Sequence, residues 1–287
     1  MGIRNNILIA FLFLCSCSSM NIANNSNCLY PLHSPYPGGV LNIQINSLYG
    51  EDLEVIRVGK KSPFICSSEF KSVNLISPIP LNSKERNIKI VFNNKTIKTI
   101  PLIDKDYRES RITIVDNNMV NPPQEILPRI RMEASIIKAA KNINTTTINP
   151  VLAMTMPTLG IESSEFGVRR FINGTPRNRH TGLDIAAPEG TNVYAPLDGL
   201  ILLSEEFFYR GNIVYIDHGN GIISSFSHLQ KSLVKKNKKV KTGDLIGKVG
   251  KTGRVTGPHL HWEVSILGTT VDPKLFLKTI NNSLDNL

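Results

Sequence analysis

Short β-prone runs, broken by glycine and other turn residues, occupy the C-terminal half of this 287-residue chain. Between Pro150 and Phe276 they fall at residues 191–195, 199–203, 212–217, 222–227, 245–249 and 259–264. A series of short strands between turn signals is typical of an all-β barrel or sandwich. The sequence therefore predicts an all-β domain over residues 150–280, followed by a frayed tail at residues 281–287.

The N-terminal part of the chain alternates apolar and polar residues with the period of a half-buried strand. Alternation is clear at Leu41, Ile43 and Ile45 and again at residues 88–92, and residues 111–115 form a further β-prone run. These strands predict a small β-sandwich over residues 36–116.

One amphipathic helix is expected between the two β regions. Prolines and an acidic residue at 121–125 mark a helix start, and apolar residues then recur at helical spacing up to Ile137. Pro128 is expected to delay the true start, and the helix should end before Asn142. Residues 117–149 are therefore interpreted as a linker that contains this helix.

Residues 1–17 have the three-part layout of a secretory signal: Arg4 is the only charge, an apolar stretch fills residues 7–14, and small polar residues follow. The apolar run 7–15 is nine residues long, whereas a membrane-spanning helix needs about 20. This excludes a multi-spanning membrane protein. Residues 18–35 are rich in Asn and Ser and are interpreted as a tether.

The stretch from Leu14 to Cys17 resembles the lipobox of bacterial lipoproteins, in which the cysteine after the cleavage site is acylated. Here that residue is Cys17; the alternative is simple cleavage a few residues further on. We expect an exported, periplasmic protein of the cell envelope, anchored as a lipoprotein if Cys17 is acylated. In that oxidising compartment Cys28 and Cys66 are expected to form a disulfide.

Five of the six histidines fall between residues 180 and 261. His259 and His261 are two residues apart in a predicted strand, so both side chains point to one face, about 7 Å apart. His180 and Asp184 would lie about 13 Å apart in a straight strand, too far for one metal ion. A bend at Gly182 is therefore required if both are ligands.

His228 ends a β-prone run and is expected to project from a strand edge. His218 lies in a turn-forming stretch and is interpreted as structural. Catalytic zinc takes three nitrogen or carboxylate ligands and keeps a position for water. Any one of these histidines alone is more often structural than functional, so their order along the chain carries the interpretation.

Several motifs occur in an order that resembles the lysostaphin/LytM-type zinc endopeptidases, which cut peptides of the bacterial cell wall. The similarity spans roughly Pro157 to Phe276. It rests on His180-x-x-x-Asp184, Ser227-His228-Leu229, the run from Gly257 to Glu263, Phe166-Gly167-Val168-Arg169, Gly211-Asn212 and Thr252-Gly253.

The resemblance implies a predominantly antiparallel β fold with a long groove and one zinc ion per chain. It implies that His180, Asp184 and His261 hold the metal and that His228 and His259 are the non-ligand catalytic pair. Two neutral imidazoles and one carboxylate leave zinc an open position at which water is activated near neutral pH.

We therefore expect an exported zinc metallo-endopeptidase that hydrolyses peptide cross-links of bacterial peptidoglycan. The alternative is a non-catalytic relative that binds the wall and activates other hydrolases, although such relatives typically lack some ligands and this chain keeps all five positions. The N-terminal β domain could bind wall, dock a regulator or cover the groove.

The chain carries 33 basic and 23 acidic residues, a net charge of +10. This excess favours polyanionic neighbours. A polyanion-binding module is a further alternative, built on the basic residues between Lys231 and Arg254. The stretch has no nucleic-acid motif and no interleaved aromatic residues, so sequence-specific nucleic-acid binding is not expected.

Overall fold

The computed structural model describes residues 28–46, 56–59, 62–69, 72–146 and 152–278. The expected signal peptide at residues 1–17, with Cys17, lies outside these residues, as do residues 18–27 of the expected tether and the tail at 281–287. In the described part of the chain, no helix is long and apolar enough to cross a membrane.

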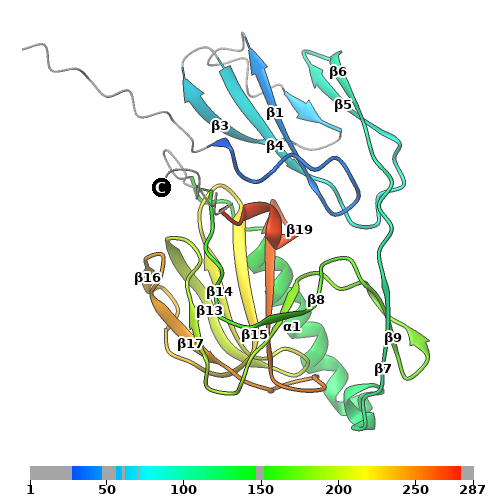
Figure 1. The fold of residues 1–287 in the computed structure, drawn as a ribbon, viewed down its shortest axis with the longest axis vertical. Helices are drawn as coiled ribbons and strands as arrows, with labels where there is room; N and C mark the ends of the chain where they lie inside the picture. Colours follow the sequence, from blue (N-terminus) through cyan, green and yellow to red (C-terminus); the bar gives the residue numbers. More distant parts are fainter. Residues whose placement is uncertain (1–27, 47–55, 60–61, 70–71, 147–151, 279–287) are drawn as a thin grey trace, which may run out of the picture.

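The fold is mainly β, as predicted (Figure 1). In the N-terminal part, two three-stranded antiparallel sheets pack together. One has the order β1-β4-β3 and the other β2-β5-β6. The strands are β1 (Val40–Asn46), β2 (Arg57–Val58), β3 (Phe64–Glu69), β4 (Ser72–Pro78), β5 (Asn87–Phe92) and β6 (Lys95–Pro101). Between the sheets lies an apolar cluster that includes Leu41, Ile43 and Ile90, which agrees with the predicted β-sandwich.

The C-terminal part is built on one large antiparallel sheet, with the order β16-β13-β14-β15-β18-β11-β8. Three further strands extend it: β17 pairs with β12 and β15, and β19 pairs with β18. The strands are β8 (Ile161–Ser164), β11 (Leu183–Ala186), β12 (Asn192–Tyr194), β13 (Gly199–Phe207), β14 (Gly211–Asp217), β15 (Ile222–Ser232), β16 (Lys239–Val240), β17 (Leu245–Val249), β18 (His259–Ile266) and β19 (Thr269–Val271).

The expected helix is α1 (Leu127–Lys141), preceded by the short 3₁₀ turns η3 (Asn117–Met119) and η4 (Gln124–Ile126). Pro128 lies in the first turn of α1, where its missing N–H costs nothing. The helix lies against the large sheet (Figure 1), and Ile136, Ile137 and Ala140 pack on side chains of β13, β14 and β15. The main apolar core covers the other side of the sheet. It includes Leu275 and Phe276 of the last described helical turn, η5 (Pro273–Phe276).

A third small sheet joins the two parts of the chain. Strand β7 (Glu109–Ile112) pairs in parallel with β9 (Arg169–Ile172), which forms a hairpin with β10 (Thr175–Pro176). The sequence placed residues 111–115 with the N-terminal sandwich, but this pairing sets the strand beside the hairpin that leads to His180. Nearby, the ring of Tyr107 lies over Gly167, and its hydroxyl donates to the carbonyl of Pro37, 2.6 Å away.

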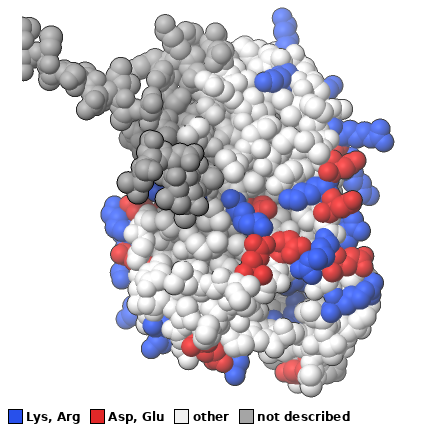
Figure 2. Space-filling view, viewed as in Figure 1, with Lys and Arg blue, Asp and Glu red and all other residues white. Residues whose placement is uncertain are grey.

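Cys28 and Cys66 form the expected disulfide, with their Cα atoms 5.8 Å apart. Residues 28–35 lie against the folded part: the Leu32 amide donates to the Leu275 carbonyl, and His33 accepts from the Asn42 amide. Figure 2 shows one face of the molecule, on which Lys and Arg side chains are interspersed with Asp and Glu side chains.

Candidate metal centre and active site

His180 and Asp184 reach the same point because the chain bends between them. His180 precedes β11, and its amide donates to the Val168 carbonyl. The bend falls at Gly182, as the spacing required. Here only glycine fits, because a Cβ at this position would lie 2.5 Å from the Trp262 carbonyl oxygen.

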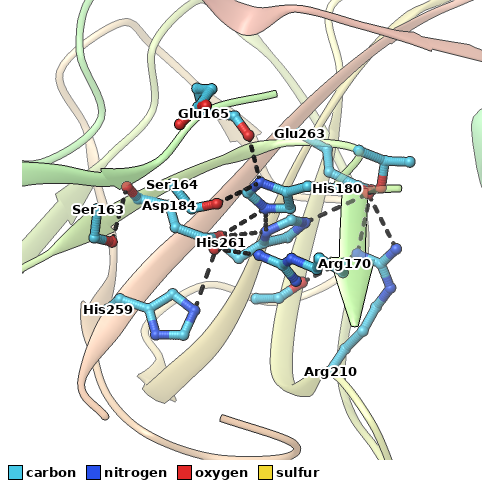
Figure 3. Close-up of polar contacts among 12 residues, drawn as sticks. Ser163, Ser164, Glu165, Arg170, His180, Asp184, Arg210, His259, His261 and Glu263 are labelled. Atoms are coloured by element: carbon cyan, nitrogen blue, oxygen red, sulfur yellow. Dashed lines mark hydrogen bonds and ion pairs between the residues drawn. The ribbon is translucent and has the colours of Figure 1, made fainter. Parts of the chain in front are cut away.

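His261 comes from the neighbouring strand, β18, where it lies directly opposite Asp184 of β11. The structure thus brings the three predicted ligands together (Figure 3). Asp184 Oδ1 lies 2.9 Å from His180 Nε2 and 2.6 Å from His261 Nδ1, and the two nitrogens are 3.0 Å apart. All three side chains are buried, with 2%, 5% and 7% of His180, Asp184 and His261 exposed.

The contacts of the other nitrogen of each ring decide whether His180 Nε2 and His261 Nδ1 carry a proton or a lone pair. His180 Nδ1 lies 2.7 Å from the Glu165 carbonyl oxygen, which can only accept, so this nitrogen carries the proton. His261 Nε2 faces the Glu263 carboxylate at 3.4 Å. In the neutral rings, His180 Nε2 and His261 Nδ1 therefore present lone pairs to each other and to Asp184 Oδ1.

Two lone pairs and a carboxylate oxygen that face one another are three ligand atoms that could bind one metal ion. Ligands about 2.1 Å from a tetrahedral ion lie roughly 3.4 Å apart, whereas the three atoms here are 2.6 to 3.0 Å apart, so a bound ion would spread them by less than about 1 Å. The donor set and its geometry therefore fit a metal ion.

Glu263 supports His261 from behind and is itself buried. It follows His261 by two residues on β18 and so lies on the same face. Lys141, at the end of α1, contacts its carboxylate at 2.8 Å and Arg210 contacts it at 3.2 Å; Thr181 donates a further hydrogen bond. Burial raises the pKa of Glu263, but the charges of Arg210 and Lys141 hold it well below the ordinary value.

His228 and His259 form a second pair beside the three candidate ligands, with ring centroids 4.9 Å apart. His228 Nδ1 donates to the Thr252 carbonyl at 2.9 Å and His259 Nδ1 to the Gly257 carbonyl at 2.9 Å. Each ring therefore keeps its Nε2 free of a proton. His259 Nε2 lies 3.9 Å from Asp184 Oδ1, so this pair borders the cluster without joining it.

The backbone of His228 is held in a conformation that side chains rarely adopt, with φ at 64°. It lies at an irregularity of β15, and its amide donates to the Arg210 carbonyl. Residues in such strained conformations occur preferentially at functional sites. Burial lowers the pKa of His228 well below the usual value, which keeps the ring neutral.

The remaining histidines lie elsewhere. His218 is buried and donates from Nδ1 to the Asp198 carbonyl at 2.7 Å, consistent with the structural role expected for it. His33 is hydrogen-bonded near β1.

Sequence reasoning missed four charged residues around the cluster: Lys141, Arg170, Arg210 and Glu263. Arg170, on β9, donates to Asp184 Oδ2 at 2.5 Å. Glu263 could have been found by the alternation that placed His259 and His261 on one face of β18. For the three basic residues no local signal exists, because each comes from a different distant element.

Comparisons with known proteins agree with this geometry. The model of peptidase family M23 matches residues 178–273. The peptidoglycan DD-endopeptidase ShyA of Vibrio cholerae serotype O1 is 47% identical over 111 residues, which cover 38% of this chain and 26% of ShyA. The DD-carboxypeptidase/endopeptidase Mpg of Neisseria meningitidis serogroup B is 43% identical over 111 residues, 39% of this chain and 26% of Mpg. The chain thus spans about a quarter of the length of these relatives.

One solved structure matches nearly the whole fold. A protein from Pseudomonas aeruginosa, described as a peptidase M23, aligns with a TM-score of 0.66 and 30% identity over 87% of this chain and 98% of its own. With 87% of this chain covered, the alignment extends well beyond the large C-terminal sheet. The resemblance to lysostaphin/LytM-type peptidases is confirmed, and the chain belongs to peptidase family M23.

Proposed function

We propose that this protein is a zinc-dependent endopeptidase that hydrolyses peptide cross-links of bacterial peptidoglycan. The observation that carries the proposal is the buried triangle of His180 Nε2, Asp184 Oδ1 and His261 Nδ1, bordered by two further histidines. The cross-link class is suggested by ShyA and ShyC, both named peptidoglycan DD-endopeptidases. We therefore propose a bond between two D-amino acids as the one cut.

His180, Asp184 and His261 would hold the zinc ion, since two neutral imidazoles and one carboxylate are a usual catalytic zinc set. When bound, zinc supplies the Lewis acidity that activates water and polarises a peptide carbonyl. Arg170 and Glu263 fix the orientation of two of these side chains by hydrogen bonds to Asp184 Oδ2 and by contact with His261 Nε2.

His228 and His259 are placed to move protons. Each is anchored by an Nδ1–H that donates to a backbone carbonyl, so each Nε2 can accept a proton from water or, once protonated, donate a hydrogen bond to a developing oxyanion. Because the pKa of both rings is lowered by burial, both start in the neutral form at pH 7.

Purified wall sacculi test the proposal directly. Incubation with the zinc-loaded protein should release soluble peptides whose new termini map to one D,D cross-link, and a chelator should stop the release until zinc is added back. Sacculi that bind the protein without any release of peptides would instead indicate the non-catalytic wall-binding alternative.

The division of labour among the histidines gives a sharper test. His180→Ala and Asp184→Ala should lose both the stoichiometric metal and activity, because two donors hold zinc poorly. His228→Ala and His259→Ala should keep the metal and lose roughly 100-fold or more in kcat, the usual share of general acid–base catalysis. Metal content by mass spectrometry and peptide release measure the two effects separately, and full activity in His259→Ala would contradict the assigned role.

We also propose that the protein is exported and acts in the cell envelope. The disulfide between Cys28 and Cys66 supports this, because such bonds persist in oxidising compartments. Acylation of Cys17 remains part of the proposal. Mass spectrometry of the mature amino terminus tests it: a diacylglyceryl cysteine at position 17 is the expected result, and an unmodified terminus beyond Cys17 would refute lipidation.

A further inference from the structure

Two arginines face each other across the β9–β10 hairpin, beside the metal cluster. The Arg177 amide donates to the Arg170 carbonyl at 2.9 Å, which continues the antiparallel register of the hairpin. Residues opposite each other in such a pair project to the same face. Arg170 reaches Asp184 Oδ2 at 2.5 Å, so this face of the hairpin is turned toward the metal ligands (Figure 3).

A third arginine, Arg254, comes from the loop between β17 and β18. Its guanidinium stacks over the Tyr209 ring, 4.3 Å from the centroid. Arg254 donates to the Met119 carbonyl and Arg177 to the Val120 carbonyl, each at 3.4 Å. Because these two carbonyls are adjacent in the chain, the two guanidiniums converge on one short segment.

Burial lowers the pKa of Arg254, and the charges of Arg177 and Arg170 lower it further, as expected if the three are close together.

The three guanidiniums have far more donors than partners. Each carries five N–H groups, and among the described residues each makes one side-chain hydrogen bond. Two of those bonds, at 3.4 Å, are long for an N–H···O contact. Arg177 Nε is buried and has no hydrogen-bond partner in the described part of the chain.

Charge is equally unbalanced. Asp184 is the one carboxylate that pairs with these arginines within the described ranges, and its other oxygen belongs to the metal cluster. Three positive charges beside a metal site, with unused planar forks of donors, suit an anion with two coplanar oxygens.

We propose that Arg170, Arg177 and Arg254 form a binding site for a free carboxylate of the peptide substrate, adjacent to the metal ligands. The proposal rests on the proposed function and deepens it, since it names the chemical group that the site recognises. Arg170 stays on Asp184 and fixes the site relative to the metal, while Arg177 and Arg254 supply the free donors. The enzyme then selects cross-linked peptides whose carboxyl groups are not amidated.

The test uses the full-length, zinc-loaded protein and two substrates: a purified cross-linked muropeptide dimer with free carboxylates, and the same dimer amidated at every carboxyl group. The wild-type protein should show a KM roughly 10-fold or more lower for the free acid, the range expected for charge-assisted hydrogen bonds. Arg177→Gln and Arg254→Gln should raise KM about 10-fold for the free acid, with kcat within about twofold.

Neither variant should change the KM for the amidated dimer. Arg131→Gln is the matched control, because it removes the same charge from an exposed side chain on α1 that makes no hydrogen bond or ion pair with the hairpin in the described part of the chain. Arg177→Lys keeps the charge without the planar fork and should recover only part of the discrimination. It also replaces Arg177→Gln should that variant fail to fold by circular dichroism.

A binding readout separates failure of this proposal from failure of the proposed function. Both dimers are titrated into the protein with ¹⁵N-labelled arginine, and the Nε–Hε signals of Arg177 and Arg254 are followed. Shifts with the free acid alone support the site even if neither dimer is cleaved. Equal shifts with both dimers, or an equal wild-type KM for both, would overturn it.

Discussion

Backbone carbonyl groups fix the protonation of most histidines in the C-terminal region. His180, His218, His228 and His259 each point Nδ1 at a carbonyl oxygen, between 2.7 and 2.9 Å away. His261 is the exception, since its Nε2 faces Glu263 and its Nδ1 faces the cluster. Main-chain carbonyls set four of the five tautomers. The residues that provide these carbonyls can therefore change their side chains without changing which ring nitrogen is protonated.

His218 should make stability depend on pH. Burial lowers the pKa of His218 to about 4, from 6.5 in the unfolded chain. Below pH 6.5 the unfolded chain therefore takes up a proton that the folded protein does not, and the free energy of unfolding falls until about pH 4. The loss is about 3 kcal/mol at most. Chemical denaturation at a series of pH values measures it.

His218→Gln is the comparison for this pH effect. The variant lacks the titrating ring, so its free energy of unfolding should fall less between pH 7 and pH 4 than that of the wild-type protein, whatever its stability at pH 7. Parallel pH profiles for the two proteins would show that His218 does not titrate as the structure indicates.

The family resemblance supplied the candidate ligands, and local rules showed that they could meet. His259 and His261 share a strand face, and Gly182 permits the bend that brings His180 to Asp184. Arg170 obeys no such rule, because its position depends on the pairing of β9 with β7 and on the packing of the β9–β10 hairpin beside β11. A single sequence carries no signal for such long-range contacts.

At the scale of elements, the turn before β9 depends on one glycine. Gly167 has a φ of 91°, and a Cβ there would lie 2.0 Å from the Tyr107 ring. Gly167→Ala should therefore lower the free energy of unfolding by about 3 kcal/mol or more, through backbone strain and the displaced ring. Gly174, in the β9–β10 turn, has a φ of 77° with open space around it, so Gly174→Ala should cost only about 1 kcal/mol.

Thermal and chemical unfolding of these two alanine variants separates the ring contact from the backbone cost. Similar losses for both would mean that Tyr107 moves aside freely, and the packing of the N-terminal segment on β9 would then contribute little.

Helix α1 is tied to the site by its last residue. Lys141 contacts Glu263 at 2.8 Å, with 14% and 1% of the two side chains exposed. Lys141→Met should lower the free energy of unfolding by about 3 kcal/mol, because it leaves a buried carboxylate with one cation fewer. Arg210 remains as a partner, which limits the loss. Lys138→Met, exposed one turn earlier, should change stability by less than about 0.5 kcal/mol.

Urea denaturation measures both variants of α1. A loss in Lys141→Met no larger than in Lys138→Met would show that Arg210 alone compensates Glu263.

The elements that were predicted correctly are those with a clear local sequence pattern. Alternation located β1, β5 and β18, and the proline-led apolar period located α1. Strands β8 and β10 and the parallel pairing of β7 with β9 were not predicted. Strand β10 has only two residues, and the partners of β8 and β7 lie about 20 and 60 residues away in the chain. Parallel pairing in particular leaves no turn signal between the strands.

At the scale of the whole molecule, the sheet β1-β4-β3 is buried on both faces. Leu41 and Leu75 face the second N-terminal sheet, whereas Val40, Phe64 and Ile76 belong to the same core cluster as residues of the large sheet. The N-terminal strands therefore share a core with the part that holds the candidate active site.

The disulfide closes the N-terminal edge of this shared core. It links residues 38 apart in the sequence, and a loop of that length contributes about 4 kcal/mol through the entropy of the unfolded chain. Cys28 and Cys66 are 5% and 1% exposed, so replacement by alanine leaves only a small cavity and adds no buried polar group. The free energy of unfolding of the double variant Cys28→Ala/Cys66→Ala should therefore be about 4 kcal/mol lower than that of the wild-type protein.

Wild-type protein under a reductant should lose a similar amount of stability, and the double alanine variant should lose nothing further. Zinc affinity of the folded double variant should equal that of the wild-type protein, because His180, Asp184 and His261 are positioned by β11, β18 and the β9–β10 hairpin. In the described structure, none of the three candidate ligands contacts either cysteine directly. A drop in zinc affinity that follows the drop in stability would therefore show that loosening of the N-terminal sheet reaches the metal ligands through the shared core.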